Sequence, residues 1–133
     1  MAGLLRAPGQ SPMLPGAVRT GDLIVTSGIV APRVMQALGA GAAPDLDFRA
    51  EADDALAALL TAISALGGSA AGVMKLEAFL ADPGDFAAWN EAFLSVWPEP
   101  GPARITLVSA FAVPGVRIEV QAIAAVQPGG YTA

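Results

Sequence analysis

The 133-residue sequence contains no cysteine and no histidine. The first absence excludes disulfides, thiol nucleophiles and thiolate metal sites, and the second excludes acid–base chemistry by imidazole. The acidic pairs at 45/47 and 53/54 lack the other ligand types and the loop spacing of a calcium site, so no metal site is expected. Any catalysis must therefore use carboxylates, arginine, Lys75, hydroxyl groups, backbone amides or water.

Basic residues are scarce. Lys and Arg together number 7 against 12 Asp and Glu, which gives a formal net charge of -5. The basic residues are scattered singly along the chain rather than clustered. Because nucleic-acid binding relies on clustered Lys and Arg, we expect no nucleic-acid partner.

Long hydrophobic runs are also missing. Gly and Pro interrupt the charge-poor stretches well short of the roughly 20 residues that cross a bilayer. Residues 1–12 hold one basic residue and no apolar run of signal-peptide length. We therefore expect no membrane association and a cytoplasmic location.

Apolar residues, by contrast, are abundant: hydrophobic types make up 54% of the chain and charged types only 14%. This composition is too apolar for a disordered chain, and the length fits one domain over residues 1–133 with short terminal tails. So apolar a chain also predicts that part of its surface is buried against another subunit.

The spacing of apolar residues, Gly and Pro predicts an α+β domain. The helix at 47–68 is the clearest element, because its apolar residues form one stripe, Asp45 or Asp47 could cap its start and Gly67-Gly68 ends it. The segment 33–39 is interpreted as a strand, followed by a flexible loop. The other expected elements are strands at 22–28, 72–82, 103–113 and 115–126 and a helix at 85–97. The order is β-β-α-β-α-β-β, with two helices on one face of the sheet, and the uncovered apolar face predicts a homo-oligomer.

Two of the scarce charges fall on the last two predicted strands. Arg104 stands near the start of the first, and Glu119 lies in the middle of the second. Since side chains alternate along a strand, Glu119 shares a face with Arg117. Both Arg104 and Glu119 could simply be exposed to solvent. Alternatively both line a cleft, in which Arg104 would clamp a carboxylate and Glu119 would handle a proton or a water.

Several motifs, in this order along the chain, resemble those of the RidA (YjgF/YER057c) family. "PARITLVSAFAVPGVRIEVQAIA" (102–124) resembles the family's closing signature, in which Pro-Ala-Arg is followed by a strand, a short turn and an Ile-Glu-Ile/Val ending. "AVRTGDLIVTSGIV" (17–30) looks like the family's first hairpin, with its Ser-Gly pair at Ser27-Gly28. The pattern "DF-x-x-x-N" recurs from Asp85 to Asn90. The resemblance covers a core of about residues 12–126.

The resemblance implies a chorismate-mutase-like fold with a mixed sheet and a barrel-like homotrimer with clefts between subunits. It also implies hydrolysis of reactive 2-imino or 2-enamino acids to 2-keto acids and ammonium, without a cofactor. In such a cleft Arg104 would hold the substrate carboxylate, and Glu119 would pass a proton between water and the leaving nitrogen. Ser27 and Gly28 would lie close to the substrate, and Thr106, on the same strand face as Arg104, could contact it.

The sequence departs from the family pattern at positions expected to line this pocket. Met13 is expected where active members usually carry tyrosine, and Ile29 where the family usually has glutamine. The Ala- and Gly-rich stretch at 36–44 is interpreted as an inserted loop. Three functions stay open: an imine deaminase, which could be tuned to apolar side chains; a trimeric binder of small carboxylates without turnover; and a pathway-specific relative that acts on another unstable intermediate.

Overall fold

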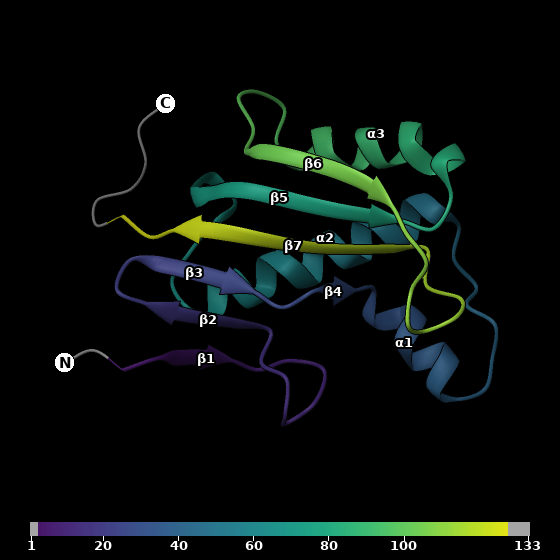
Figure 1. Cartoon of the computed structure of the whole chain (residues 1–133), viewed down its shortest axis with the longest axis horizontal. Coiled ribbons are helices and arrows are strands. Elements are labelled where there is room, and N and C mark those ends of the chain that lie inside the picture. The colour runs from purple at the N-terminus through teal and green to yellow at the C-terminus, as the bar shows by residue number, and fades with distance from the viewer. Residues whose placement is uncertain (1–2, 128–133) are drawn as a thin grey trace.

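The structure is a computed structural model that describes residues 3–127. These residues form a sheet with helices on one of its sides (Figure 1). Residues 128–133 of the expected C-terminal tail lie outside the described residues. The helices are α1 (Pro32–Gly39), α2 (Phe48–Ala65) and α3 (Phe86–Val96). The strands are β1 (Leu5–Ala7), β2 (Ala17–Thr20), β3 (Leu23–Thr26), β4 (Ile29–Val30), β5 (Val73–Leu80), β6 (Ala103–Val108) and β7 (Ile118–Ala125).

The strands follow the order β1-β2-β3-β7-β5-β6, and β4 also pairs with β7. All neighbouring strands are antiparallel except β5 and β6, which run parallel. Helix α3 makes the connection between these two parallel strands, and β6 forms one end of the sheet (Figure 1). The predicted α+β class is therefore confirmed, with a mixed sheet.

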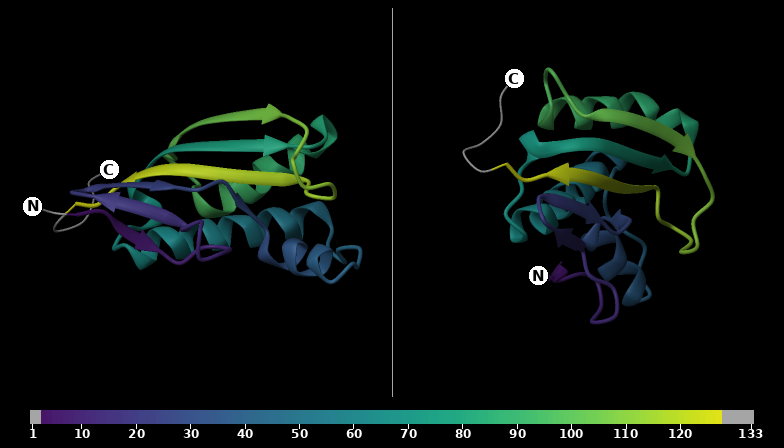
Figure 2. Two further views of the ribbon diagram at one scale, coloured as in Figure 1. Left: turned by 60° about the horizontal axis from the view of Figure 1, so that its bottom comes forward. Right: turned by 60° about the vertical axis from the view of Figure 1, so that its left-hand side comes forward.

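The two faces of the sheet differ in what covers them. Along β7, Ile118 and Val120 are buried and alternate with half-buried residues. The helices lie on one side of the sheet (Figure 2), and the buried residues of β7 share one core with the buried residues of the helices. The opposite, outer face carries exposed apolar side chains, among them Val25, Ile105 and Leu107. The sequence-based expectation of an uncovered apolar face thus holds within this chain.

Helix α2 forms where the sequence predicts it. The Asp47 carboxylate accepts a hydrogen bond of 2.7 Å from the backbone N–H of Ala50, which satisfies one of the free donors of the first turn. Leu56, Leu59 and Ile63 are buried along the predicted stripe. Capping and patterning therefore agree, and this agreement is why the helix could be predicted.

We expect Asp47→Ala to lower the free energy of unfolding by about 1 kcal/mol, because the helix loses its capping acceptor. Urea unfolding followed by circular dichroism measures the change. The exposed Asp45 is the matched control, since it lies two residues before the cap and Asp45→Ala should cost little. Equal losses in the two variants would argue against a specific cap at Asp47.

The prediction of a strand at 33–39 is wrong, because these residues form helix α1. Pro32 occupies the first turn, where its missing N–H costs nothing, and the Asp54 carboxylate accepts from the N–H of Arg33. Gly41 has a φ of +74°, and the N–H groups of Gly41 and Ala42 donate to carbonyls of the last turn, as in a Schellman motif. The stretch at 36–44 is therefore partly helix, and only its second half is loop.

The expected N-terminal tail and the expected end of one strand also differ from the structure. The chain before residue 12 is not simply a tail, since Leu5–Ala7 form β1, which pairs with β2. Strand β6 ends at Val108 instead of continuing to 113, so residues 109–117 form a connecting loop. Among the described residues, no helix combines the length and the apolar composition needed to cross a membrane.

An ion pair between the buried Glu51 and the partly exposed Arg117 joins α2 to the start of β7. Glu51 is fully buried, and its carboxylate accepts from the backbone N–H of Arg117 at 2.9 Å and from Arg117 Nε at 2.8 Å. Arg117 also donates from Nη2 to the carbonyl of Leu46, at 2.6 Å. The expected placement of Arg117 beside Glu119 is wrong, because Arg117 precedes β7 and its side chain turns to the helix layer.

Candidate functional site

Arg104 lies on β6, the end strand, on the face that the helices cover. In the parallel register with β5 it stands opposite Leu76, which is buried toward the helices. Its Nη2 donates to Asn90 Oδ1 of α3 at 2.6 Å, and its guanidinium carbon lies 4.4 Å from the centre of the Phe93 ring. The hydrogen bond and the cation–π contact fix the orientation of the guanidinium, which has five N–H donors and uses one of them for Asn90.

Thr106 lies on the same face of β6, as predicted. Its hydroxyl oxygen accepts a hydrogen bond of 3.0 Å from Nε1 of the buried Trp89. The O–H of Thr106 can therefore still donate a hydrogen bond to another group. Arg104 and Thr106, supported by Trp89, Asn90 and Phe93 of α3, form what we call the carboxylate clamp, because both offer donors to an anion.

Glu119 lies on β7, on the outer face of the sheet. It alternates with the buried Ile118 and Val120, and it is half-buried. A Cβ atom built on Gly28 would come within 2.9 Å of the Glu119 carboxyl carbon, so the missing side chain at Gly28 leaves room for the carboxylate. This close approach favours a residue without a side chain after β3.

A depression of about 340 Å³ lies beside Glu119 and contains three of the predicted residues, Ser27, Gly28 and Ile29. The Ser27 hydroxyl donates to the carbonyl of Pro15 at 2.6 Å, which ties the wall of the depression together. Its remaining lining residues are Gln10, Leu14, Pro15, Gly16 and Gln121.

Met13 does not line this depression, although the sequence predicts it there. Residues 11–14 form a tight turn, in which the N–H of Leu14 donates to the carbonyl of Ser11 and the N–H of Met13 to the Ser11 hydroxyl. Because of this turn, Met13 is 87% exposed, and Leu14 lines the depression instead. The apolar wall next to Ser27 and Gly28 is therefore Leu14.

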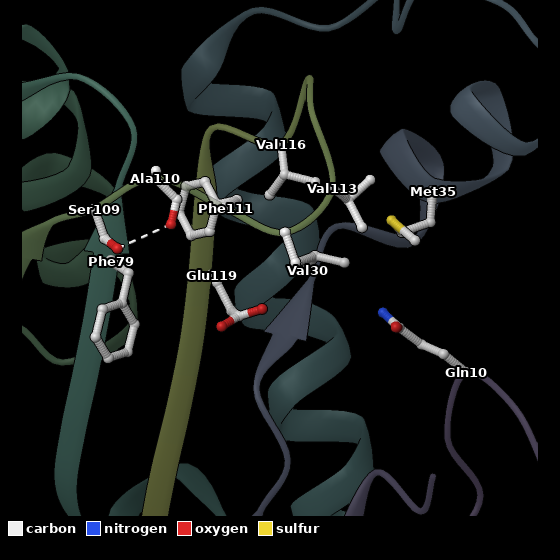
Figure 3. Close-up of a pocket in the computed structure, with 11 residues that line it drawn as sticks. Gln10, Val30, Met35, Phe79, Ser109, Ala110, Phe111, Val113, Val116 and Glu119 are labelled. Carbon is white, nitrogen blue, oxygen red and sulfur yellow. Dashed lines mark hydrogen bonds between the residues drawn. The ribbon is translucent and has the colours of Figure 1, made fainter. Parts of the chain in front are cut away.

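A second hollow, which we call the apolar chamber, also borders the Glu119 carboxylate and has a volume of about 330 Å³ (Figure 3). Gln10 and Glu119 line both hollows, so the two adjoin at these residues. The chamber walls come from the loop after β6, from β4, β5 and α1. Its apolar lining residues are Val30, Met35, Phe79, Ala110, Phe111, Ala112, Val113 and Val116.

Arg104 and Glu119 do not come together within one chain. Glu119 stands opposite Phe79 of β5, on the outer face, whereas Arg104 stands opposite Leu76, on the helix face. The predicted site residues therefore form two half-sites on opposite faces of the sheet. One half-site is the carboxylate clamp, and the other is Glu119 with Ser27, Gly28 and Ile29.

Sequence reasoning missed several residues of these half-sites. Asn90 belongs to the "DF-x-x-x-N" motif, and Phe93 belongs to the apolar spacing of the helix. Neither signal indicates that the two residues contact Arg104. Gln10 and Met35 carried no signal. Within residues 3–127, no cluster of three or more acidic side chains is arranged to hold a metal ion.

A model of the family described as Endoribonuclease L-PSP matches residues 6–126. This chain belongs to that family. Solved structures of the same family share the fold and are similar over nearly the whole chain, so the resemblance stated from the sequence is confirmed.

The similar structures include RidA from an Antarctic Psychrobacter, which is 28% identical, with a TM-score of 0.75 and coverage of 91% of this chain and 94% of that one. A protein of unknown function from Pseudomonas aeruginosa is 26% identical, with a TM-score of 0.80 and coverage of 95% and 94%. A member of the YjgF/YER057c/UK114 family from Mycobacterium tuberculosis is 21% identical, with a TM-score of 0.78 and coverage of 93% and 100%.

Among curated proteins, the chain is similar to mmf1 and mmf2 of Schizosaccharomyces pombe, both described as mitochondrial. The identities are 44% over 62 residues and 43% over 63 residues. The matches cover 44% of this chain and only 38% and 49% of the two relatives, so less than half of each relative is spanned. The cytoplasmic location expected from the sequence stays a prediction.

Proposed function

We propose that this chain hydrolyses reactive 2-imino or 2-enamino acids to 2-keto acids and ammonium, in a cleft that two copies build together. The observation that supports the proposal is the placement of Arg104 with Thr106 on one face of the sheet and of Glu119 on the other. Neither half is sufficient alone, and each offers what the other lacks.

The carboxylate clamp would hold the acid group of the substrate. Arg104 can give two parallel N–H donors to a carboxylate, and the Thr106 hydroxyl can add a third donor. Because Asn90, Phe93 and Trp89 already orient these groups, little side-chain freedom is lost on binding. The substrate carbon would then be positioned without any cofactor.

Glu119 would carry the proton transfers. As a water oxygen forms a bond to the protonated imine carbon, Glu119 takes one water proton and a carbinolamine results. Glu119 then returns the proton to the amine nitrogen, the carbon–nitrogen bond breaks, and ammonia leaves with the hydroxyl proton as ammonium. The products are the 2-keto acid and ammonium, and Glu119 is again a carboxylate.

A homotrimer is part of the proposal. The outer face, with Val25, Ile105 and Leu107 exposed, is apolar enough to require a cover in water. A second copy seated on it could bring its own carboxylate clamp toward Glu119. Closed cyclic symmetry would repeat this cleft at each subunit interface.

The family description names an endoribonuclease, but the chemistry of this chain gives that activity little support. A net charge of -5 with scattered basic residues is a poor match for a phosphate backbone. The chain also lacks histidine, the side chain most often used for proton transfer near neutral pH. A small carboxylate is the better match to one oriented arginine.

The test is a coupled assay in which an amino-acid oxidase generates imino acids and the release of 2-keto acid is timed. We expect the protein to accelerate release and Arg104→Ala to abolish the acceleration, while Arg6→Ala on the exposed part of β1 leaves it intact. A folded protein that binds 2-keto acids through Arg104 but accelerates no imine would instead be a carboxylate binder, and the proposal would be wrong.

Asn90→Ala is expected to weaken the binding of a 2-keto acid by roughly 10- to 100-fold, since a hydrogen bond to a charged group contributes about 1.5–3 kcal/mol. The loss reflects a guanidinium that is no longer held in place. Titration calorimetry measures the affinity, with Ser95→Ala on the same helix as the control. Unchanged affinity would mean that Asn90 does not orient Arg104.

A further inference from the structure

The apolar chamber lies beside the group to which we assign the chemistry, yet nothing in the reaction itself needs it. Figure 3 shows the Glu119 carboxylate between Phe79 on one side and Val30 on the other, with Phe111 and Met35 farther along the walls. Of the residues 3–127, Glu119 is the only charged one that lines the hollow. A chamber of this kind offers burial to an apolar group attached to the reacting carbon.

Charge decides how a substrate would lie. A substrate carboxylate would be repelled by Glu119 and belongs at the carboxylate clamp, whereas a protonated imine nitrogen is attracted to Glu119. With these two groups placed, the side chain is the remaining substituent on the imine carbon. Of the two hollows that meet at Glu119, the chamber has the larger share of apolar side chains.

The chamber of this chain has more room than a methyl group fills. Its volume is about 330 Å³, whereas an apolar cavity of about 150 Å³ is enough to bind benzene. The walls are also held together, because Gly115 of the loop after β6 approaches Leu38 of α1 so closely that a Cβ there would lie 3.2 Å from it. Residues of α1 and of the loop thus face each other across a defined space.

We propose that the apolar chamber selects substrates, so that this protein prefers 2-imino acids with a large apolar side chain, of the size of leucine or phenylalanine, over those with a methyl or ethyl group. This inference rests on the proposed function and adds the substrate class to it. Met35, Phe111 and Val113 are the residues that would determine the specificity.

The test compares imines generated from alanine and from leucine, using the full chain and two variants. We expect kcat/KM for the leucine-derived imine to exceed that for the alanine-derived imine by roughly tenfold or more, as apolar pockets discriminate by such factors. Val113→Trp fills the chamber from an exposed loop position and should remove this preference, so that the ratio of the two kcat/KM values falls toward one. Leu4→Trp, also exposed and outside the chamber, should change neither rate.

A second measurement separates this inference from the proposed function. Titration calorimetry compares pyruvate with 4-methyl-2-oxopentanoate, which are stable products of the two imines. Hydrolysis of both imines at similar rates, unaffected by Val113→Trp, would overturn the selectivity and leave the hydrolase function in place. If no imine is hydrolysed, tighter binding of 4-methyl-2-oxopentanoate that Val113→Trp abolishes would support the chamber and overturn only the hydrolase. If no imine is hydrolysed and the two keto acids bind equally, both proposals are overturned.

Discussion

Glu119→Gln is expected to lower kcat for imino-acid hydrolysis by about 10²–10⁴-fold, the usual contribution of a positioned acid–base group. The amide keeps the shape of the side chain beside Gly28 but cannot take a proton from water or return one to nitrogen. Binding of 2-keto acids should persist, because the carboxylate clamp lies on the other face of the sheet. Single-turnover measurement of keto-acid formation gives the rate of the chemical step without a contribution from product dissociation.

Glu77→Gln provides the matched control. Glu77 lies on β5 opposite Gln121, on the same outer face and also half-buried, but in neither hollow that contains Glu119. An equal loss of rate in the two variants would point to the charge of the outer face rather than to proton transfer. A Glu119→Gln protein with nearly full activity would remove Glu119 from the mechanism.

Arg117→Met is expected to lower the free energy of unfolding by about 3–5 kcal/mol, the cost of leaving a buried charge without its partner. The reason is Glu51, which is fully buried and whose two carboxylate oxygens both accept from Arg117. Without the guanidinium, the carboxylate keeps only the backbone N–H. Urea unfolding of the purified variant measures the loss.

Neutralising the carboxylate should reverse much of this damage. In the double variant Glu51→Gln with Arg117→Met, the glutamine oxygen can still accept from the backbone N–H of residue 117 and no charge is buried. Arg33→Met, at an exposed position of α1, controls for the loss of an arginine. A double variant no more stable than Arg117→Met would show that packing, and not the uncompensated charge, limits stability.

The parts of the fold that could be predicted are those in which local signals agree. In α2, the cap at Asp47 and the stripe from Leu56 to Ile63 point to the same helix. Segment 33–39 lacked such agreement, since its valine favours a strand and Gly39 weakens a helix. Pro32 and Gly41 are local helix signals at its two ends, but α1 also depends on contacts from elsewhere, namely Asp54 of α2 on its first turn and the burial of Val34. No local reading of this segment includes those contacts.

The candidate site shows the same division. The strand period correctly placed Arg104 and Thr106 on one face of their strand, because it depends only on alternation. This face and the face of Glu119 lie on opposite sides of the sheet because of the way in which β5, β6 and β7 pair. No single strand encodes that pairing. The turn at 11–14 likewise exchanges the places of Met13 and Leu14, since one residue of displacement redirects a side chain.

The placement of Arg104 and Glu119 on opposite faces has a genetic consequence under the proposed assembly. Every cleft would take one half from each of two neighbours, so a defect in Arg104 and a defect in Glu119 would damage different halves. Two alleles, each inactive by itself, would then restore some working clefts when expressed in the same cell. Two alleles damaged in the same half would not complement each other.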